Sequence, residues 1–174
     1  RQIKPSLLVL ENRITPSVSL VKDINLGSFG SFNINVGQIV QCNGALFLSA
    51  DDGIHGRELW KSDGSESGTS LVKDINPGIT NSNNLSFYSS IQYNNVLYFS
   101  ANNGTNGYEL WRSDGTSSGT FMVKDINTGL SSGITGNDFE NLNGTLFFTA
   151  NDGTFGEELW NCLLYTSPSP RDAT

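Results

Sequence analysis

The chain has 174 residues and a net charge of −7, with 17 acidic against 10 basic residues. It has no basic run that could follow a phosphate backbone, which argues against nucleic acid or an anionic membrane surface as a partner. No apolar run approaches the roughly 20 residues that span a bilayer, so we expect no membrane insertion.

Residues 1–17 precede the repeated part of the chain. The segment PSLLVLENRITPS, from Pro5, resembles a short export-associated leader found near the start of large bacterial surface proteins. The alternative is a frayed lead-in to the first strand, because the apolar stretch at 7–10 is too short for the core of a signal peptide. Since the chain opens on Arg1, we expect its natural N-terminus to be missing or processed.

Two short motifs recur along the rest of the chain. VKDIN starts at Val21, Val72 and Val123, at intervals of 51 residues, and ELW starts at Glu58, Glu109 and Glu158. A repeat of this length is typical of a copied supersecondary unit that needs a neighbour to cover its apolar face. We therefore predict one repeat domain over residues 18–161. Its parts are a strand over 18–25, blades over 26–76 and 77–127, and a partial blade over 128–161.

Each complete unit contains four predicted strands. The pairs Asn43-Gly44, Asn94-Asn95 and Asn143-Gly144 favour the positive φ angles of a type I′ hairpin turn. The next strands, over 45–50, 96–101 and 145–150, carry apolar residues at both alternating positions, which predicts that both of their faces are covered. The ELW strand follows, and an Asp-Gly pair then turns the chain into the VKDIN strand.

Antiparallel strands buried on both faces, four to a unit of about 50 residues, predict an all-β fold, a partial β-propeller of about three blades. Closed propellers have about four to eight blades, so we expect an open arc of a truncated ring, poorly soluble or molten when expressed alone. The strand over 18–25 has no ELW block before it, and we expect it to complete the last blade of the ring. Parallel β-helices and leucine-rich solenoids are the alternative folds.

The third repeat breaks off after Asn161, where CLLYTSPSPRD stands in place of the continuation seen in the first two copies. This string resembles the translation of a sequencing-library adapter over its full length. We therefore expect residues 162–174 to be a non-native read-through tail and the natural protein to continue past Asn161. The other cysteine, Cys42, aligns with Tyr93 and Leu142 and is expected to be a small buried hydrophobe rather than a reactive thiol.

The ELW and SDG blocks, with the Gly-Thr and VKDI that follow them, resemble the ELWxxDGT repeat family, also called hyalin-like repeats, of bacterial secreted and surface proteins. The likeness covers residues 18–161. It is complete in ELWRSDGTSSGT from Glu109, whereas Ser65 replaces the threonine in the first copy. The resemblance implies a secreted or cell-surface bacterial protein built as a propeller. It supplies no catalytic residues.

Calcium is the one cofactor that the sequence suggests. Asp52, Glu58, Asp152 and Glu158 place hard oxygen ligands around Gly-rich loops, as calcium prefers. In the second copy, asparagine replaces both acidic residues at the start of the loop. The alternative is that Asp-Gly or Asn-Gly makes the turn, while the glutamate caps backbone amides or pairs with a nearby Lys or Arg.

The tryptophans of the ELW motif suggest a second kind of site. Trp60, Trp111 and Trp160 are candidate sugar-stacking residues, as in propeller lectins, or else residues that pack one blade on the next. The only histidine, His55, lies in a Gly-rich loop and is expected to be solvated. No nucleophile elbow, Cys-His pair, P-loop or zinc spacing is present.

The lysines of VKDIN, which are Lys22, Lys73 and Lys124, are expected on the solvated outer face of the last strand or paired between blades. Repetition without a unique site, together with the family resemblance, predicts a non-catalytic module for protein interaction, adhesion or matrix structure outside the cell. Its partners would be an extracellular protein or glycan and the missing blades of the same chain. The alternatives are a carbohydrate-binding propeller lectin and a non-catalytic part of a larger secreted enzyme.

Overall fold

The regular elements of the chain are all β-strands. A computed structural model describes residues 16–27, 30–32, 39–79, 90–136 and 138–164. These residues contain no helix, and hence none long and apolar enough to span a bilayer. The strands form three antiparallel sheets, which confirms the expected all-β class.

Each sheet is an up-and-down meander whose strands follow the order of the sequence. The first sheet contains β1 (Ile39–Cys42), β2 (Ala45–Asp51), β3 (Arg57–Ser62) and β4 (Ser70–Lys73). The second contains β5 (Ser90–Tyr93), β6 (Val96–Asn102), β7 (Tyr108–Ser113) and β8 (Phe121–Lys124). The third contains β9 (Phe139–Leu142), β10 (Thr145–Asn151) and β11 (Glu157–Leu163). The prediction of four strands is therefore confirmed in the two units that reach VKDIN.

Tight turns join the first two strands of every sheet. Asn43 and Gly44 have φ angles of 52° and 72°, and Asn94 and Asn95 have φ angles of 47° and 64°. The equivalent pair in the third sheet has φ angles of 53° and 82°. Positive φ at both central residues is the signature of a type I′ turn, whose twist matches that of the strands it joins. The predicted hairpins are thus confirmed.

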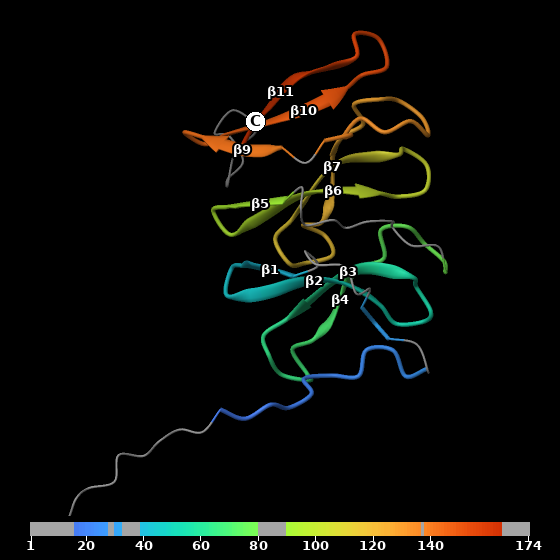
Figure 1. The fold of residues 1–174 in the computed structure, drawn as a ribbon, viewed down its shortest axis with the longest axis vertical. Coiled ribbons are helices and arrows are strands. Elements are labelled where there is room, and N and C mark those ends of the chain that lie inside the picture. Colours follow the sequence, from blue (N-terminus) through green and yellow to red (C-terminus); the bar gives the residue numbers. More distant parts are fainter. Residues whose placement is uncertain (1–15, 28–29, 33–38, 80–89, 137, 165–174) are drawn as a thin grey trace, which may run out of the picture.

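The three sheets lie one above another in the order of the sequence (Figure 1). Phe47 of β2 and Phe99 of β6 belong to one buried apolar cluster between the first and second sheets. Leu110 of β7 and Phe148 of β10 belong to the cluster between the second and third. Each sheet therefore covers the apolar face of the next, and the second sheet is covered on both faces. Close packing of this kind is the main source of stability in a protein interior.

Two boundaries differ from those expected from the sequence. Residues 18–25 form no strand among the described residues, and the expected pairing of this segment with the missing last blade stays a prediction. Ile24 nevertheless packs on the first sheet, in a cluster with Leu48 and Trp60. At the other end, β11 continues two residues past Asn161 and pairs them with β10, so residues 162 and 163 belong to the third sheet. Residues 1–15 and 165–174 lie outside the described residues, and a non-native origin of the tail stays a prediction.

Candidate functional site

A buried glutamate connects the ELW strand of the second sheet to the chain that leaves the sheet. Glu109 Oε2 accepts a hydrogen bond from the amide of Ile126 at 3.0 Å. Its Oε1 accepts from the amides of Gly133 at 2.8 Å and Asn127 at 3.4 Å. The glutamate side chain is fully buried. Its carboxylate therefore holds the segment that runs from the second sheet to the third.

Burial raises the pKa of Glu109 above its ordinary value of 4.5, although the three amide hydrogen bonds act in the opposite direction. The neighbouring charge of Asp125 adds to the increase. A raised pKa means that the folded state holds the proton more tightly than the unfolded state does. The contribution of Glu109 to stability consequently falls as the pH rises from 4.5 through the raised pKa.

The first sheet repeats this arrangement. Glu58 accepts hydrogen bonds from the amides of Ile75 at 2.7 Å and Asn76 at 3.3 Å, and it is also fully buried. In the third sheet, Glu158 is exposed. Glu58 and Glu109 thus cap backbone amides, which is the alternative to a metal ligand. Their oxygen atoms position the connector between sheets.

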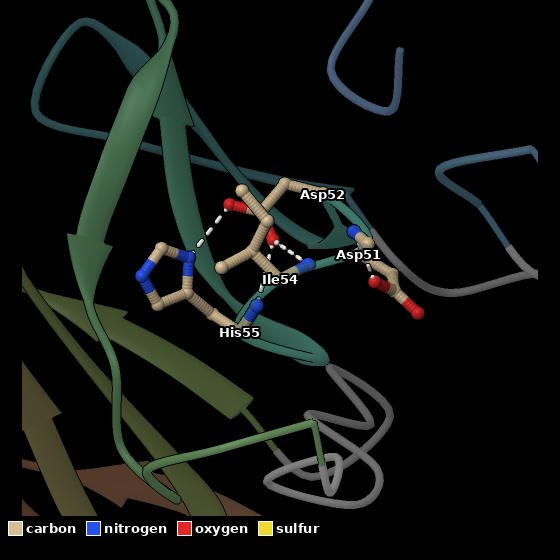
Figure 2. Close-up of polar contacts among 5 residues, drawn as sticks. Asp51, Asp52, Ile54 and His55 are labelled. Carbon is tan, nitrogen blue, oxygen red and sulfur yellow. Dashed lines mark hydrogen bonds and ion pairs between the residues drawn. The ribbon is translucent and has the colours of Figure 1, made fainter. Parts of the chain in front are cut away.

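The Gly-rich loop after β2 is organised by two aspartates, as Figure 2 shows. Asp51 Oδ1 accepts a hydrogen bond from the amide of Gly53 at 2.7 Å. Asp52 Oδ1 accepts from the amides of Ile54 at 2.9 Å and His55 at 2.8 Å, and its Oδ2 lies 2.7 Å from His55 Nδ1 (Figure 2). The histidine expected to be simply solvated is therefore half-buried and ion-paired.

The contact between Asp52 and His55 shifts the pKa of both side chains. The hydrogen bond to Asp52 raises the pKa of His55 above 6.5, and the negative charge of Asp52 adds to the increase. Burial disfavours the charged form of Asp52, but hydrogen bonds from His55 and Ile54 outweigh it and lower the pKa of the carboxyl below 3.8. Both groups are therefore charged together over a wider pH range than they would be in isolation.

The same loop forms in the other copies, whether the first residues are Asp or Asn. Asn103 Oδ1 accepts hydrogen bonds from the amides of Thr105 at 3.0 Å and Asn106 at 2.9 Å. Asp152 Oδ1 accepts from those of Thr154 at 2.8 Å and Phe155 at 3.0 Å. Because a neutral amide oxygen serves as well as a carboxylate, the loop needs an acceptor here but no negative charge.

The structure gives the four calcium candidates separate surroundings. Asp52 and Asp152 bind the amides of their own loops, Glu58 binds amides beyond β4, and Glu158 is exposed. Within the described ranges, no three His, Cys, Asp or Glu side chains gather in a group that could hold a metal ion. Calcium binding stays a prediction, and it would need ligands beyond these pairs.

Two of the VKDIN lysines bind backbone carbonyls of the unit that follows, whereas Lys124 is exposed. Lys73, in the last strand of the first sheet, donates a hydrogen bond to the carbonyl of Thr120 in the second sheet at 2.7 Å. Lys22 makes the same contact with Thr69 of the first sheet, also at 2.7 Å. Sequence analysis left contact between units open as an alternative for these lysines but did not name the acceptor. The lysine and the Ser-Gly-Thr loop that it binds recur at a constant spacing.

The loop that each lysine binds is held together by repeated side-chain contacts. Ser113 and Thr120 share a buried hydrogen bond of 2.7 Å between their hydroxyls, and the Thr116 hydroxyl donates to Asp114 Oδ1 at 2.7 Å. The first copy has the same two bonds at 2.6 Å and 2.7 Å, with Ser65 in place of the second threonine. The SDGT motif is therefore a folded loop that presents a carbonyl group to the neighbouring sheet.

The tryptophans pack on the faces of the sheets: Trp60 lies against the segment that contains Ile24, whereas Trp111 and Trp160 lie between successive sheets. Trp60 and Trp111 are only 7% and 5% exposed, and each belongs to an apolar cluster. Trp160 is half-buried and packs against the cluster between the second and third sheets. Trp60 and Trp111 therefore present no open face on which a sugar ring could stack. Cys42 is buried in the first cluster, as expected, and burial raises the pKa of its thiol.

The buried glutamates, the loop aspartates and the bound lysines thus have structural roles: they stabilise loops and connect one unit to the next. The chain matches no protein-family model, no curated protein and no solved structure. Its function is accordingly inferred from the repeated geometry.

Proposed function

We propose that this chain is a non-catalytic repeat module of a secreted or cell-surface protein, which serves protein interaction, adhesion or matrix structure. The observation that carries the proposal is that the glutamates and lysines of the first two repeats are occupied by internal hydrogen bonds. Glu58 and Glu109 bind backbone amides, and Lys22 and Lys73 bind backbone carbonyls. An active site needs a set of reactive groups that converge on a substrate, whereas these groups converge on the chain itself.

We further propose that the sheets are blades of a β-propeller. Three features support this architecture: the repeat of about 50 residues, the four-stranded meander and the face-to-face order of successive sheets (Figure 1). In a propeller each blade contacts only its two neighbours, and the same is true of the apolar clusters described here. The three sheets would form one arc of the ring.

The proposed location outside the cell depends on the resemblance to ELWxxDGT repeats. The structure gives the motif residues roles that explain their recurrence: Glu for the connector, Trp for packing and SDGT for the carbonyl-bearing loop. These roles are architectural and would be needed in any member of such a family. A bacterial surface protein built from many units would use them as its framework.

Binding of the labelled chain to bacterial cells tests this function. We expect saturable binding that is lost when the cells are first treated with protease and retained when their glycans are oxidised with periodate. Loss after periodate alone, accompanied by saturable binding on a glycan array, would favour the lectin alternative. Trp160→Ala is the informative variant in that case, because Trp160 is the one ELW tryptophan that is not fully buried. The absence of any saturable binding to cells would contradict the proposal.

A further inference from the structure

We propose that residues 18–24 of one copy of the 174-residue chain pair with the edge of β11 in a second copy and complete its three-stranded sheet. This inference goes beyond the proposed function, because it depends on the geometry of the repeat and holds whatever the module binds. Three features of the chain support the proposed pairing: a donor segment, an acceptor edge and a cavity beside that edge.

The donor segment has the sequence of a last strand but no sheet to join. SLVKDIN occurs at 19–25 and again at 70–76. In the second occurrence residues 70–73 form β4, whereas in the first no residue is in a strand. Val18 and Leu20 are largely exposed, Leu20 at 80%. A sequence that pairs in one place and lies unpaired in another is a natural candidate for strand addition.

The acceptor is the edge at which β4 and β8 lie in the other two sheets. Trp60 of β3 pairs with Leu71 of β4, and Trp111 of β7 pairs with Met122 of β8. In the third sheet β11 is the outermost strand, with Trp160 at the equivalent position. The register therefore places Leu20 of the copy that donates 18–24 opposite Trp160 of the copy that contributes β11.

The side chain of Leu20 has a cavity to enter. A space of about 310 Å³ lies between the second and third sheets, beside the edge of β11. Its lining includes Leu110, Lys124, Phe148 and Trp160. Between the first and second sheets, Met122 of β8 packs against the equivalent cluster. Leu20, which aligns with Met122, would fill the cavity with apolar surface in the same way.

The lysine contact would also be reproduced. Lys73 reaches the carbonyl of Thr120, the residue that stands two positions before Met122. The matching contact in the assembly joins Lys124 of the copy that contributes β11, which is exposed in the single chain, to the carbonyl of Val18 in the copy that donates 18–24. The acceptor is a backbone carbonyl, which every residue has, so Val18 can accept this hydrogen bond as Thr120 does. Both the apolar and the polar contacts of a complete sheet would then be present.

The resulting contact is head-to-tail. Lys22 already binds the first sheet of its own chain, so pairing of 18–24 with β11 would bring that first sheet over the open face of the partner's third sheet. This placement would cover Leu159, which is 71% exposed. Because donor and acceptor are different surfaces, each copy has one of each, and the contact is heterologous.

Sedimentation of the 174-residue chain over a range of concentrations tests the proposal. We expect reversible association of the wild type, and Leu20→Asp to weaken it by about 100-fold or more, because the variant loses the apolar packing of Leu20 and places a carboxylate among mainly apolar side chains. Ile79→Asp is the matched control, since Ile79 is 83% exposed and lies outside the proposed contact. It should associate as the wild type does. Far-UV circular dichroism should show unchanged strand content in both variants.

Mixing two variants tests the head-to-tail arrangement itself. Leu20→Asp removes the donor and Leu159→Asp the acceptor, so each should be monomeric alone, whereas an equimolar mixture should form a 1:1 heterodimer. A wild type that stays monomeric at every concentration would overturn the proposal. So would Leu20→Asp that associates as strongly as Ile79→Asp, or a mixture of the two deficient variants that remains monomeric.

Discussion

The second and third sheets carry the same ELW motif in very different surroundings. In β7, Glu109 and Leu110 are almost completely buried, with exposures of 0% and 1%. In β11, Glu158 is exposed and Leu159 is 71% exposed. The second sheet lies between two others, whereas the third has a neighbour on one face (Figure 1). The ELW motif is the same in both strands, so the difference in burial comes from what covers it: β7 has the paired strand β8, the connector after it and the third sheet, none of which has a counterpart on β11 in the described residues.

This difference shows where the stability of such a chain resides. The strands and turns of a unit form by local pairing, but its ELW strand contributes to the stability of the fold only where another part of the chain covers it. Stability should then grow roughly as a sum over sheet-to-sheet contacts, as in other repeat proteins. Equivalent substitutions in β7 and β11 separate the two contributions.

The largest effect is expected at the buried glutamate. Glu109→Ala should lower the free energy of unfolding by about 4 kcal/mol, because it leaves the amides of Ile126 and Asn127 without their acceptor, while that of Gly133 keeps only the carbonyl of Tyr108. Glu158→Ala, at the equivalent exposed position, should change it by less than about 0.5 kcal/mol. Urea denaturation followed by tryptophan fluorescence measures both. Equal losses would show that the carboxylate acts within its own sheet.

A somewhat smaller effect is expected at the neighbouring leucine. Leu110→Ala should lower the free energy of unfolding by about 3 kcal/mol through loss of packing and a residual cavity. Leu159→Ala should be nearly neutral in the monomer, since its side chain is already in solvent. Thermal unfolding of the two variants at low protein concentration makes the comparison. A destabilising Leu159→Ala would mean that the open face of the third sheet is covered in solution.

The lysine between sheets should matter less. Lys73→Met keeps the length of the side chain and removes its hydrogen bonds to the carbonyls of Thr120 and Ser117, so a loss of about 1 kcal/mol is expected. Lys124→Met should lie within about 0.5 kcal/mol of the wild type, because Lys124 is exposed in the single chain. Chemical denaturation at two salt concentrations would check that the effect of Lys73 is local.

The smallest effect is a dependence on pH in the first Gly-rich loop. The pKa of His55 is raised in the folded state, so its ion pair with Asp52 stabilises the loop below pH 6.5, and this stabilisation is lost as the pH rises through the raised pKa. His55→Asn, which copies the residue of the second loop, should abolish this part of the pH dependence. Melting temperatures at about pH 5.5 and about pH 8.5 provide the measurement. The idea fails if the variant and the wild type show the same difference between the two pH values.

Local features of the fold were predictable because their causes are local. The Asn-Gly and Asn-Asn pairs favour positive φ angles at a turn. Apolar residues on both faces of a strand indicate a sheet that is covered on both sides. SLVKDIN forms β4 at 70–73 but no strand at 19–25, because a strand needs a partner and the partner expected for 18–25 was the last blade. Sequence reasoning also left two roles open for Glu58, because the amides that it binds lie 17 and 18 residues further along the chain. Contact of Lys73 with the next unit was one of two expectations, but its acceptor Thr120 could not be named for the same reason, since the contact spans 47 residues.

The Gly-rich loops keep one backbone shape while their chemistry changes. Their turns accept either a carboxylate or an amide oxygen, so selection can alter the charge of a loop without rebuilding it. The residue at the equivalent tip is a histidine at 55, an asparagine at 106 and a phenylalanine at 155. A protein with many such units would present different side chains at equivalent loop positions, one in each unit, on loops of the same backbone conformation. Single substitutions at this loop position could then change what each unit contacts without changing its fold.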